Sequence, residues 1–243
     1  MTLSHRIALV TGANKGIGLE IARQLAQAGV FVIMGARDAG RGNAAVADLA
    51  AQGLETAFVA LDLLDETSIA TAAAHIAEHY GRLDILVNNA GIVDWTDSVP
   101  SRAALPAVRR TMDTNFFGTL AVTQAMLPLL LKSTAARVVN LSSSLGSLAM
   151  NGDPSSPYYS AQLIGYNASK AALNMLTVQL SEEFRGTPHV VTSVSPGYVK
   201  TDFTGGQGNV MPDEPAKMPV KYALLGDGAI SGQAVDAEGV MAW

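Results

Sequence analysis

Short, continuous apolar runs alternate along this chain with longer segments in which apolar residues recur every three or four positions. A run that is apolar at every position, instead of at every second one, is typical of a parallel strand buried on both faces. These runs predict seven strands, at residues 7–10, 30–34, 56–61, 83–87, 137–141, 190–194 and 233–235. Strands that alternate with helices indicate βαβ units and a mostly parallel sheet covered on both sides.

The segments between the runs have helical periodicity. In the first of them, Ile17, Ile21 and Leu25 share one face. Further helices are predicted at residues 40–52, 65–79, 103–115, 116–131, 167–184 and, as a short one, 220–225. No repeat or linker interrupts the pattern, so we expect one α/β domain over residues 1–243, with a Rossmann-like, doubly wound, seven-stranded sheet.

Two segments, residues 144–163 and 198–217, are long and polar, and each follows a predicted strand. Long loops in compact domains are usually functional or disordered. Ligands bind to open α/β sheets at the carboxyl ends of the strands. We therefore expect these two loops to form the walls of a substrate pocket.

Composition removes several classes of function. A formal charge of −5, with no cluster of basic residues, argues against nucleic acid as a partner. The chain has no cysteine, which excludes disulfides and thiolate chemistry, and no metal site is expected because His75 and His79 read as a solvated helix end. The start of the chain shows no secretory signal, and the apolar stretch at 116–131 is too short to span a bilayer. We expect a soluble, cytoplasmic protein with no membrane partner.

A glycine-rich turn, TGANKGIG, joins the first strand to the first helix at residues 11–18. Glycines allow a tight turn and a close approach of backbone to ligand, and a helix N-terminus favours a phosphate group. The G-x-x-x-G-x-G spacing differs from the standard G-x-G-x-x-G fingerprint, so the turn alone is a weak signal. Its place in the first βα unit favours a nucleotide over a simple packing role.

The end of the second strand indicates which dinucleotide is bound. An acidic residue there would bind the ribose 2′-hydroxyl of NAD, whereas an arginine accommodates the phosphate of NADP. The strand ends in Ala36 and Arg37, and Lys15 lies in the glycine turn. Two cations favour NADP(H), although Asp38 would favour NAD(H) if the strand ended one residue later.

Tyr166 and Lys170 are four residues apart in a predicted helix and therefore share a face. Alone, such a pair is an ordinary surface feature. However, Ser142 and Ser143 end the preceding strand, Asn115 lies at a helix boundary, and an NNAG segment at 88–91 ends the fourth strand. The order and strand positions of these motifs make the combination specific.

With these motifs the whole chain resembles the short-chain dehydrogenase/reductase family, and ARD at 36–38 together with Lys15 is similar to its NADPH-using carbonyl reductases. The resemblance implies that Tyr166 is the general acid, Lys170 its partner, Ser143 the hydroxyl that orients the carbonyl, and Asn115 the holder of a water in a proton relay. It also implies an NADP(H) site in which Asp62 meets the adenine, Asn89 the ribose and Thr201 the carboxamide. The residues expected to bind the cofactor are Gly12, Asn14, Lys15, Gly16, Ile17, Gly18, Arg37, Asp62, Leu63, Asn89, Ala90, Gly91, Tyr166, Lys170, Pro196, Gly197, Val199 and Thr201.

The chemistry fits reduction of a ketone or aldehyde. Hydride delivery to a carbonyl leaves an alkoxide that must be protonated, and a phenol with a pKa of about 10 is a weak base for the reverse reaction. A nearby ammonium such as Lys170, together with the charge of the oxidised nicotinamide, is expected to lower the pKa of Tyr166. The segment between Ser143 and Tyr166 is longer than in the shortest family members, and Tyr158 in it is followed by Gln162 in place of a lysine.

Other activities stay open at this level. One is NAD-dependent oxidation of a secondary alcohol, another is reduction of an acyl-carrier ketone, and a third is a non-catalytic NADP(H)-binding sensor, because fold does not dictate function. The helices at 116–131 and 167–184 either form the subunit interfaces of a homodimer or tetramer or only cover the sheet.

Overall fold

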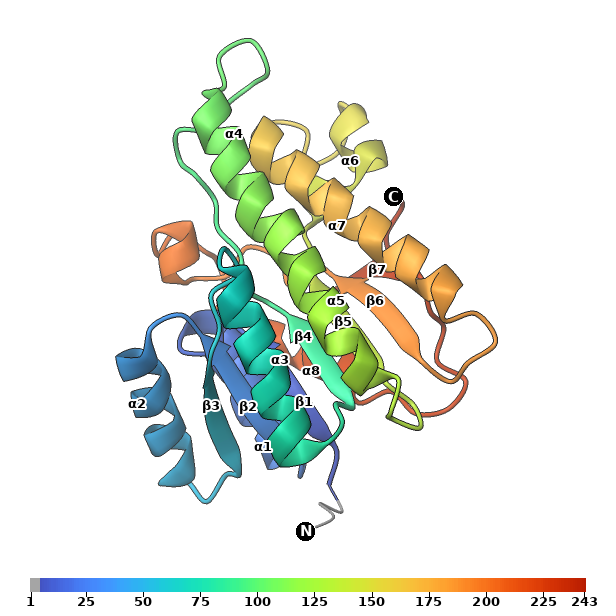
Figure 1. Ribbon diagram of the computed structural model, residues 1–243. Helices are drawn as coiled ribbons and strands as arrows, with labels where there is room; N and C mark the ends of the chain where they lie inside the picture. Colours follow the sequence, from blue (N-terminus) through green and yellow to red (C-terminus); the bar gives the residue numbers. More distant parts are fainter. Residues whose placement is uncertain (1–4) are drawn as a thin grey trace.

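The computed structural model describes residues 5–243 and has a sheet of strand order β3-β2-β1-β4-β5-β6-β7-β8 at its centre (Figure 1). β1 to β7 are parallel, and their bounds are Ile7–Thr11, Phe31–Ala36, Thr56–Ala60, Ile85–Asn88, Arg137–Leu141, Val190–Val194 and Gln233–Asp236. The prediction of a doubly wound, mostly parallel sheet is confirmed, but the predicted strand number is one too low. The additional strand, β8 (Gly239–Val240), pairs antiparallel with β7 and is too short to give a periodic signal in the sequence.

The continuous apolar runs arise because both faces of the sheet are covered. In β1, Ala8 and Val10 belong to one buried cluster, whereas Ile7 and Leu9 belong to another on the opposite face. The first cluster packs under α1 (Gly16–Gln27), α2 (Ala39–Ala50) and α8 (Asp213–Ala223). The second packs under α3 (Glu66–Tyr80), α5 (Thr119–Leu130) and α7 (Ile164–Glu183), which lie in front of the sheet in Figure 1.

α7 begins three residues before its predicted start, and three further helical segments differ from the prediction in more than small shifts of their ends. The two helices predicted at 103–115 and 116–131 are α4 (Leu105–Met112) and α5, joined without a break by a π-helical turn, η1 (Asp113–Gly118). The helix predicted at 220–225 is α8, which begins seven residues earlier, at Asp213. The sequence did not indicate this start because proline normally argues against a helix interior, where Pro219 lies. Pro215 lies in the first turn, where proline is tolerated.

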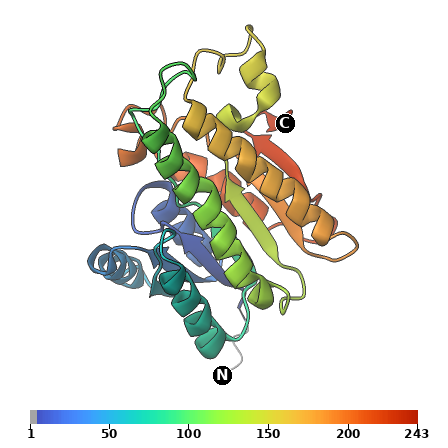
Figure 2. The same cartoon turned by 45° about the horizontal axis from the view of Figure 1, so that its top comes forward.

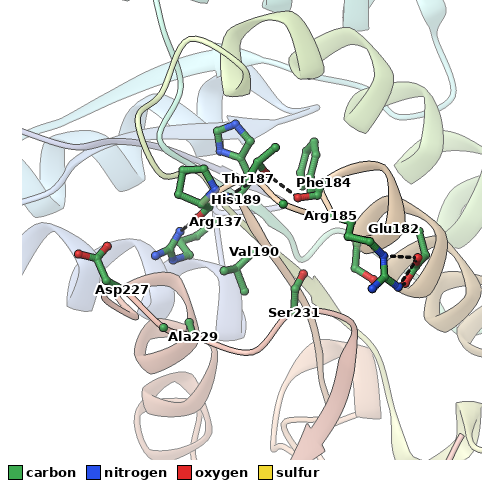
Figure 3. Close-up of a pocket in the computed structure, with 14 residues that line it drawn as sticks. Arg137, Glu182, Phe184, Arg185, Thr187, His189, Val190, Asp227, Ala229 and Ser231 are labelled. Carbon is green, nitrogen blue, oxygen red and sulfur yellow. Dashed lines mark hydrogen bonds and ion pairs between the residues drawn. The ribbon is translucent and has the colours of Figure 1, made fainter.

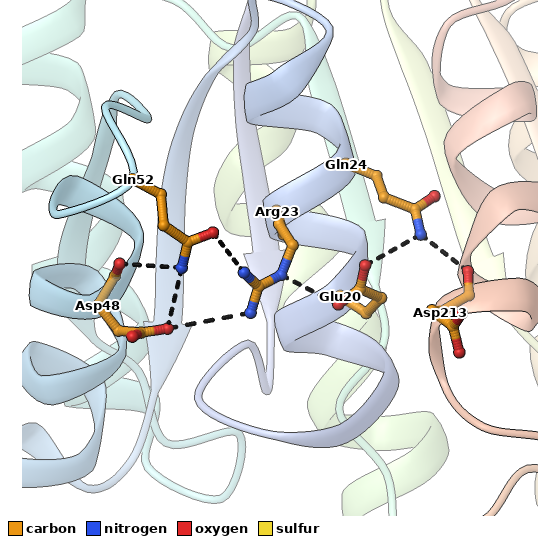
Figure 4. A network of polar contacts seen from close by, with 6 residues as sticks. All are labelled: Glu20, Arg23, Gln24, Asp48, Gln52 and Asp213. Carbon is orange, nitrogen blue, oxygen red and sulfur yellow. Dashed lines mark hydrogen bonds and ion pairs between the residues drawn. The ribbon is translucent and has the colours of Figure 1, made fainter.

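A polar network on the outer surface of α1 joins this helix to both of its neighbours (Figure 4). Arg23 donates to Glu20 at 3.1 Å and to Gln52, beyond the end of α2, at 2.6 Å. Gln24 donates to the carbonyl oxygen of Asp213 at the start of α8, at 2.8 Å. The network therefore holds α1 between α2 and α8, and with it the glycine turn from which α1 begins.

The predicted loop at 144–163 contains a 3₁₀ turn, η2 (Ser144–Gly146), and a short helix, α6 (Leu148–Gly152). Figure 2 shows this yellow segment beside the start of α7 and close to the C-terminus. A hydrogen bond of 3.0 Å from the Ala149 N–H to the carbonyl oxygen of Trp243 joins the segment to the C-terminus. The second predicted loop contains η3 (Asp202–Thr204), and its last residues belong to α8. Among the helices of residues 5–243, none combines the length and apolarity that crossing a membrane requires.

Candidate active site

A cavity of about 970 Å³ opens at the carboxyl ends of the parallel strands. The order of the strands reverses between β1 and β4, which is where doubly wound sheets bind ligands. Gly12, Arg37 and Asn89, each directly after a strand, contribute to its wall. All residues predicted to bind the cofactor line this cavity, as does Ser143, whereas Asn115 lies behind its wall.

The glycine turn provides a cradle that side chains would fill. Gly12 and Gly16 have φ angles of 66° and 59°, which favour glycine. A Cβ at Gly12 would lie 3.0 Å from the Cα of Ala90, and a Cβ at Gly18 would collide with the side chain of Asn89. The Asn89 amide donates in turn to the carbonyl oxygen of Thr11, at 2.8 Å. The turn is thus packed against the end of β4 and can present its backbone to a ligand.

The N-terminus of α1 has the features of an anion site. Its N-cap residue, Lys15, makes no capping hydrogen bond with its side chain, and no acidic residue lies in the first turn. The first N–H groups of the helix therefore have no side-chain acceptor from the cap, and the helix dipole favours negative charge there. These residues fit the pyrophosphate of a dinucleotide.

Asp38 caps α2 and forms an ion pair with Arg41. Its Oδ1 accepts from the backbone N–H of Arg41 at 2.9 Å as the N-cap of α2, and its Oδ2 accepts from Arg41 Nε at 2.9 Å. The backbone and side-chain donors of Arg41 lower the pKa of Asp38. Arg37, in contrast, is exposed and lines the cavity. The sequence reading left Asp38 as an argument for NAD(H), and the structure gives it a capping role.

The other predicted cation, Lys15, forms an ion pair across the mouth of the cavity. Its Nζ lies 2.8 Å from Oδ2 of Asp202, in the loop after β6, and this pairing lowers the pKa of Asp202. The charge of Arg41 also lowers the pKa of Asp202.

Ser143, Tyr166 and Lys170 meet at the cavity wall. Ser143 follows β5, while Tyr166 and Lys170 lie one turn apart on α7 and are 8% and 5% exposed. Lys170 Nζ donates to the carbonyl oxygen of Leu141 at 2.6 Å and lies 5.7 Å from the centroid of the Tyr166 ring. A hydrogen bond joins the Ser143 and Tyr166 side chains. The three polar groups form one cluster facing the cavity.

The hydroxyls of the neighbouring serines are paired with other side chains, whereas Ser143 Oγ accepts from the backbone N–H of Leu145 at 3.2 Å. Ser142 donates to Asn174 Oδ1 on α7 at 2.6 Å. Ser144 lies 3.0 Å from the hydroxyl of Ser195, after β6. The geometry therefore favours Ser143 as the serine that meets a ligand beside Tyr166.

Burial controls the titration of this cluster. It raises the pKa of Tyr166 to about 12, against the smaller lowering effect of the Ser143 hydrogen bond. It also lowers the pKa of Lys170 to about 8. In the protein alone, desolvation of the phenolate is therefore the dominant effect on Tyr166. The lowering expected from Lys170 together with the charge of the oxidised nicotinamide stays a prediction. At neutral pH, Tyr166 is a protonated donor and Lys170 a buried ammonium.

Asn115 lies on the π-helical turn η1 and is 1% exposed. Its amide brackets Ile92, accepting from the backbone N–H at 2.8 Å and donating to the carbonyl oxygen at 2.9 Å. Its second N–H is directed to Ser169 Oγ at 3.0 Å. Both N–H groups of Asn115 and one lone pair of Oδ1 are thus used, which leaves the second Oδ1 lone pair free to accept from a water. The two contacts with Ile92 also fix the loop that follows β4.

Apolar side chains form the outer part of the cavity. Leu145, Tyr158 and Phe203 line it, and the rings of Phe203 and Tyr166 are 5.9 Å apart. Trp95, which the sequence reading did not single out, lines it too and is 62% exposed. Met150 and Tyr159, which belong to the predicted loop at 144–163, are not among the lining residues.

A second cavity, of about 520 Å³, lies where β5 and β6 begin, at the opposite end of these strands (Figure 3). Arg137 and His189 lie together at one end of it, and the Arg185–Glu182 ion pair at the other. Arg137 is 3% exposed and donates to backbone carbonyl oxygens, those of Ala135, Ala136, Pro188, Leu225 and Gly226. None of the residues predicted to be functional lies here. Within residues 5–243 there is also no cluster of three His, Cys, Asp or Glu side chains that could hold a metal ion.

Comparison with known proteins shows which family the chain is similar to. A model of the family described as short chain dehydrogenase matches residues 6–210. Carbonyl reductase (NADPH) 1 of Macaca fascicularis is 36% identical over 259 residues, covering 90% of this chain and 91% of the relative. The NADPH-bound carbonyl reductase from chicken fatty liver has a TM-score of 0.85 at 32% identity, with 99% of this chain and 100% of that one covered. Salutaridine reductase from Papaver somniferum has a TM-score of 0.82 at 29% identity, with coverages of 95% and 99%.

Proposed function

Because this chain belongs to the short-chain dehydrogenase family, we propose that it reduces a ketone or aldehyde to an alcohol with NADPH, reversibly. The observation that carries the proposal is the cluster of Ser143, Tyr166 and Lys170 on the wall of the same cavity that the glycine turn enters. A proton donor, a hydroxyl and a buried cation beside a dinucleotide cradle are the parts that carbonyl reduction requires.

The protein's share in this chemistry is binding, orientation and proton transfer, since the bound cofactor supplies the hydride. The glycine turn and the start of α1 would hold the pyrophosphate, and Arg37 with Lys15 the 2′-phosphate. The remaining contacts are proposed for Asn14, Ile17, Asp62, Leu63, Asn89, Ala90, Gly91, Pro196, Gly197, Val199 and Thr201, which line the cavity.

Tyr166 would donate its phenolic proton to the oxygen of the substrate. Ser143 would donate a hydrogen bond to the same oxygen as negative charge develops there, and Lys170 would stabilise the phenolate that remains. We retain Asn115 as the residue that holds a water in the path by which Tyr166 regains its proton.

The substrate is proposed to be a small carbonyl compound that reaches Tyr166 between the loops at 144–163 and 198–217. Apolar lining by Leu145, Tyr158 and Phe203 suits an apolar substituent. The whole chain is proposed to act as one domain in the cytoplasm. Exposed Phe117 on η1 and Met175 on α7 support a homodimer or tetramer that uses these helices.

Initial rates with NADPH and NADH, against a panel of activated ketones and aldehydes, test the proposal. Faster turnover of at least one carbonyl compound with NADPH is the expected result. Turnover with NADH alone would replace the cofactor assignment and point to the NAD-dependent alternative. Measurable cofactor binding without turnover of any carbonyl compound would favour the sensor.

Arg37→Ala should weaken NADPH binding by about 10- to 100-fold and leave NADH binding within about 2-fold, because a charge-assisted hydrogen bond to phosphate is worth roughly 1.5–3 kcal/mol. Fluorescence titration of both cofactors measures this. Arg185→Ala, which removes an exposed arginine beside the second cavity, is the matched control. An equal loss for both cofactors would remove Arg37 from the phosphate site.

Ser143→Ala should lower kcat by about 10²-fold with little change in NADPH affinity, because a donor to the developing oxyanion is lost. Ser144→Ala serves as the control, since the Ser144 hydroxyl is paired with Ser195. Steady-state kinetics of both variants measure the difference. If Ser144→Ala were the more damaging change, the assignment within the serine run would have to move.

A further inference from the structure

A buried carboxylate lies beside the backbone of Tyr166. Asp97, in the loop between β4 and α4, is 7% exposed. Its Oδ2 accepts from the Tyr166 N–H at 2.9 Å, and its Oδ1 accepts from the Ser98 N–H at 2.8 Å. Burying a carboxylate is costly unless hydrogen bonds compensate it, so these two backbone donors hold the side chain in place.

The start of α7 depends on this loop for its capping. Its own N-cap residue, Leu163, offers no side-chain acceptor. The carbonyl oxygen of Ser98 accepts from the Ile164 N–H at 3.1 Å, and Asp97 accepts from Tyr166, the third residue of the helix. Residues nearly seventy positions earlier in the chain therefore satisfy two of the N–H groups that a helix leaves free at its start.

Gly165 makes the close approach possible. A Cβ at this position would lie 3.1 Å from Oδ2 of Asp97 and 2.9 Å from the Cα of Val108 on α4. The absence of a side chain thus lets the carboxylate reach the first turn of α7.

The other end of the same loop is fixed as well. Asn115 brackets Ile92, and Asp94 accepts from Arg110 Nε on α4 at 2.9 Å. The loop at 92–98 is therefore held at one end by Asn115 and at the other by the backbone of Tyr166. With both ends fixed, the carboxylate of Asp97 gives the first turn of α7 a defined place relative to β4.

We propose that Asp97 is a positioning residue for carbonyl reduction: by capping α7 at Tyr166, it holds the phenol in register with Ser143 and Lys170. The inference rests on the proposed role of Tyr166 as the proton donor. A displacement of about 1 Å in a reacting group can lower a rate by about 10²-fold. Asp97 acts through the Tyr166 backbone and contacts no reacting atom.

The test compares Asp97→Ala and Asp97→Asn with the wild type. The alanine variant should lower kcat by about 30- to 100-fold, leave the Kd of NADPH within about 2-fold, and raise the solvent deuterium isotope effect on kcat, since a misplaced donor transfers its proton more slowly. The asparagine variant keeps one oxygen acceptor, so its kcat should be at least about 5-fold higher than that of the alanine variant. If the alanine variant does not fold, the asparagine variant carries the same isotope-effect test.

Asp84→Asn is the matched control. Asp84 is also buried, with 6% exposure, and accepts from the backbone N–H of Ile7 at 2.9 Å. However, it lies at the amino end of β4, opposite the end where the cavity opens. The Asp84→Asn variant should be less stable than the wild type, with an unchanged kcat and an unchanged isotope effect. Asp97 variants that lose stability with an unchanged kcat and isotope effect would overturn the inference. Full activity of Tyr166→Phe would instead overturn the proposed function, so the two failures are distinguishable.

Discussion

Tyr166→Phe should lower kcat for carbonyl reduction by about 10³-fold or more while leaving NADPH affinity within about 2-fold. The reason is specific to one hydroxyl group. The phenol is buried, is hydrogen-bonded to Ser143, and has a pKa raised to about 12, so it is protonated throughout the physiological range. General acid catalysis contributes about 10²–10⁴-fold, and phenylalanine keeps the ring while removing the proton. Single-turnover rates with saturating NADPH measure the effect directly.

Tyr158→Phe provides the control for this experiment. Tyr158 also lines the cavity, but it lies in the segment between α6 and α7 and has no lysine one turn later. Its substitution should change the KM of the carbonyl substrate more than kcat. If Tyr166→Phe kept most of the activity and Tyr158→Phe lost it, the proton donor would have been assigned to the wrong tyrosine.

The parallel core could be predicted from the sequence because burial on both faces leaves a signal at every position of a strand. β1 is fully buried, and its residues alternate between two helical layers, so no polar residue interrupts the run Ile7 to Val10. β8 and the true start of α8 could not be predicted in this way. A two-residue strand has no period, and the prolines of α8 disguise a helix that is stabilised by packing on the sheet.

The site was predictable as far as it consists of residues within two positions of the ends of strands. Gly12, Arg37, Asn89 and Ser143 converge because parallel strands end at the same edge. What the sequence did not reveal is which groups are already occupied by other contacts. The capping role of Asp38, the bracketing of Ile92 by Asn115 and the contact of Asp97 with α7 depend on distances that only the folded chain sets.

The pKa of Tyr166 shows the same limit. A neighbouring lysine in the sequence suggested a lowered pKa, but burial of the phenol raises the pKa of Tyr166 in the protein alone. The raised pKa of Tyr166 bears on whether the protein favours carbonyl reduction or alcohol oxidation. Alcohol oxidation needs the phenolate, so at neutral pH the protein alone is better prepared for reduction.

The pH dependence of reduction should therefore follow Lys170 and not Tyr166. Burial lowers the pKa of Lys170 to about 8, so its ammonium is lost as the pH rises through 8, while Tyr166 stays protonated up to about 12. An uncharged lysine would no longer stabilise the phenolate that proton donation leaves. At saturating NADPH, kcat should be level below pH 7 and fall by up to about tenfold per pH unit above 8.

Lys170→Met tests this assignment, because it removes the charge and keeps a long apolar side chain. It should lower kcat at pH 7 by about 10³-fold and abolish the decline above pH 8, since the group that titrates is gone. Lys200→Met, at an exposed lysine on the cavity rim, is the control and should keep the decline. If kcat of Lys170→Met still fell above pH 8 as in the wild type, the titrating group would be a residue other than Lys170. Because Lys170 Nζ also donates to the carbonyl oxygen of Leu141, NADPH titration of the variant separates loss of charge from loss of cavity shape. An unchanged Kd together with the lost pH dependence would assign to Lys170 an electrostatic role in proton transfer.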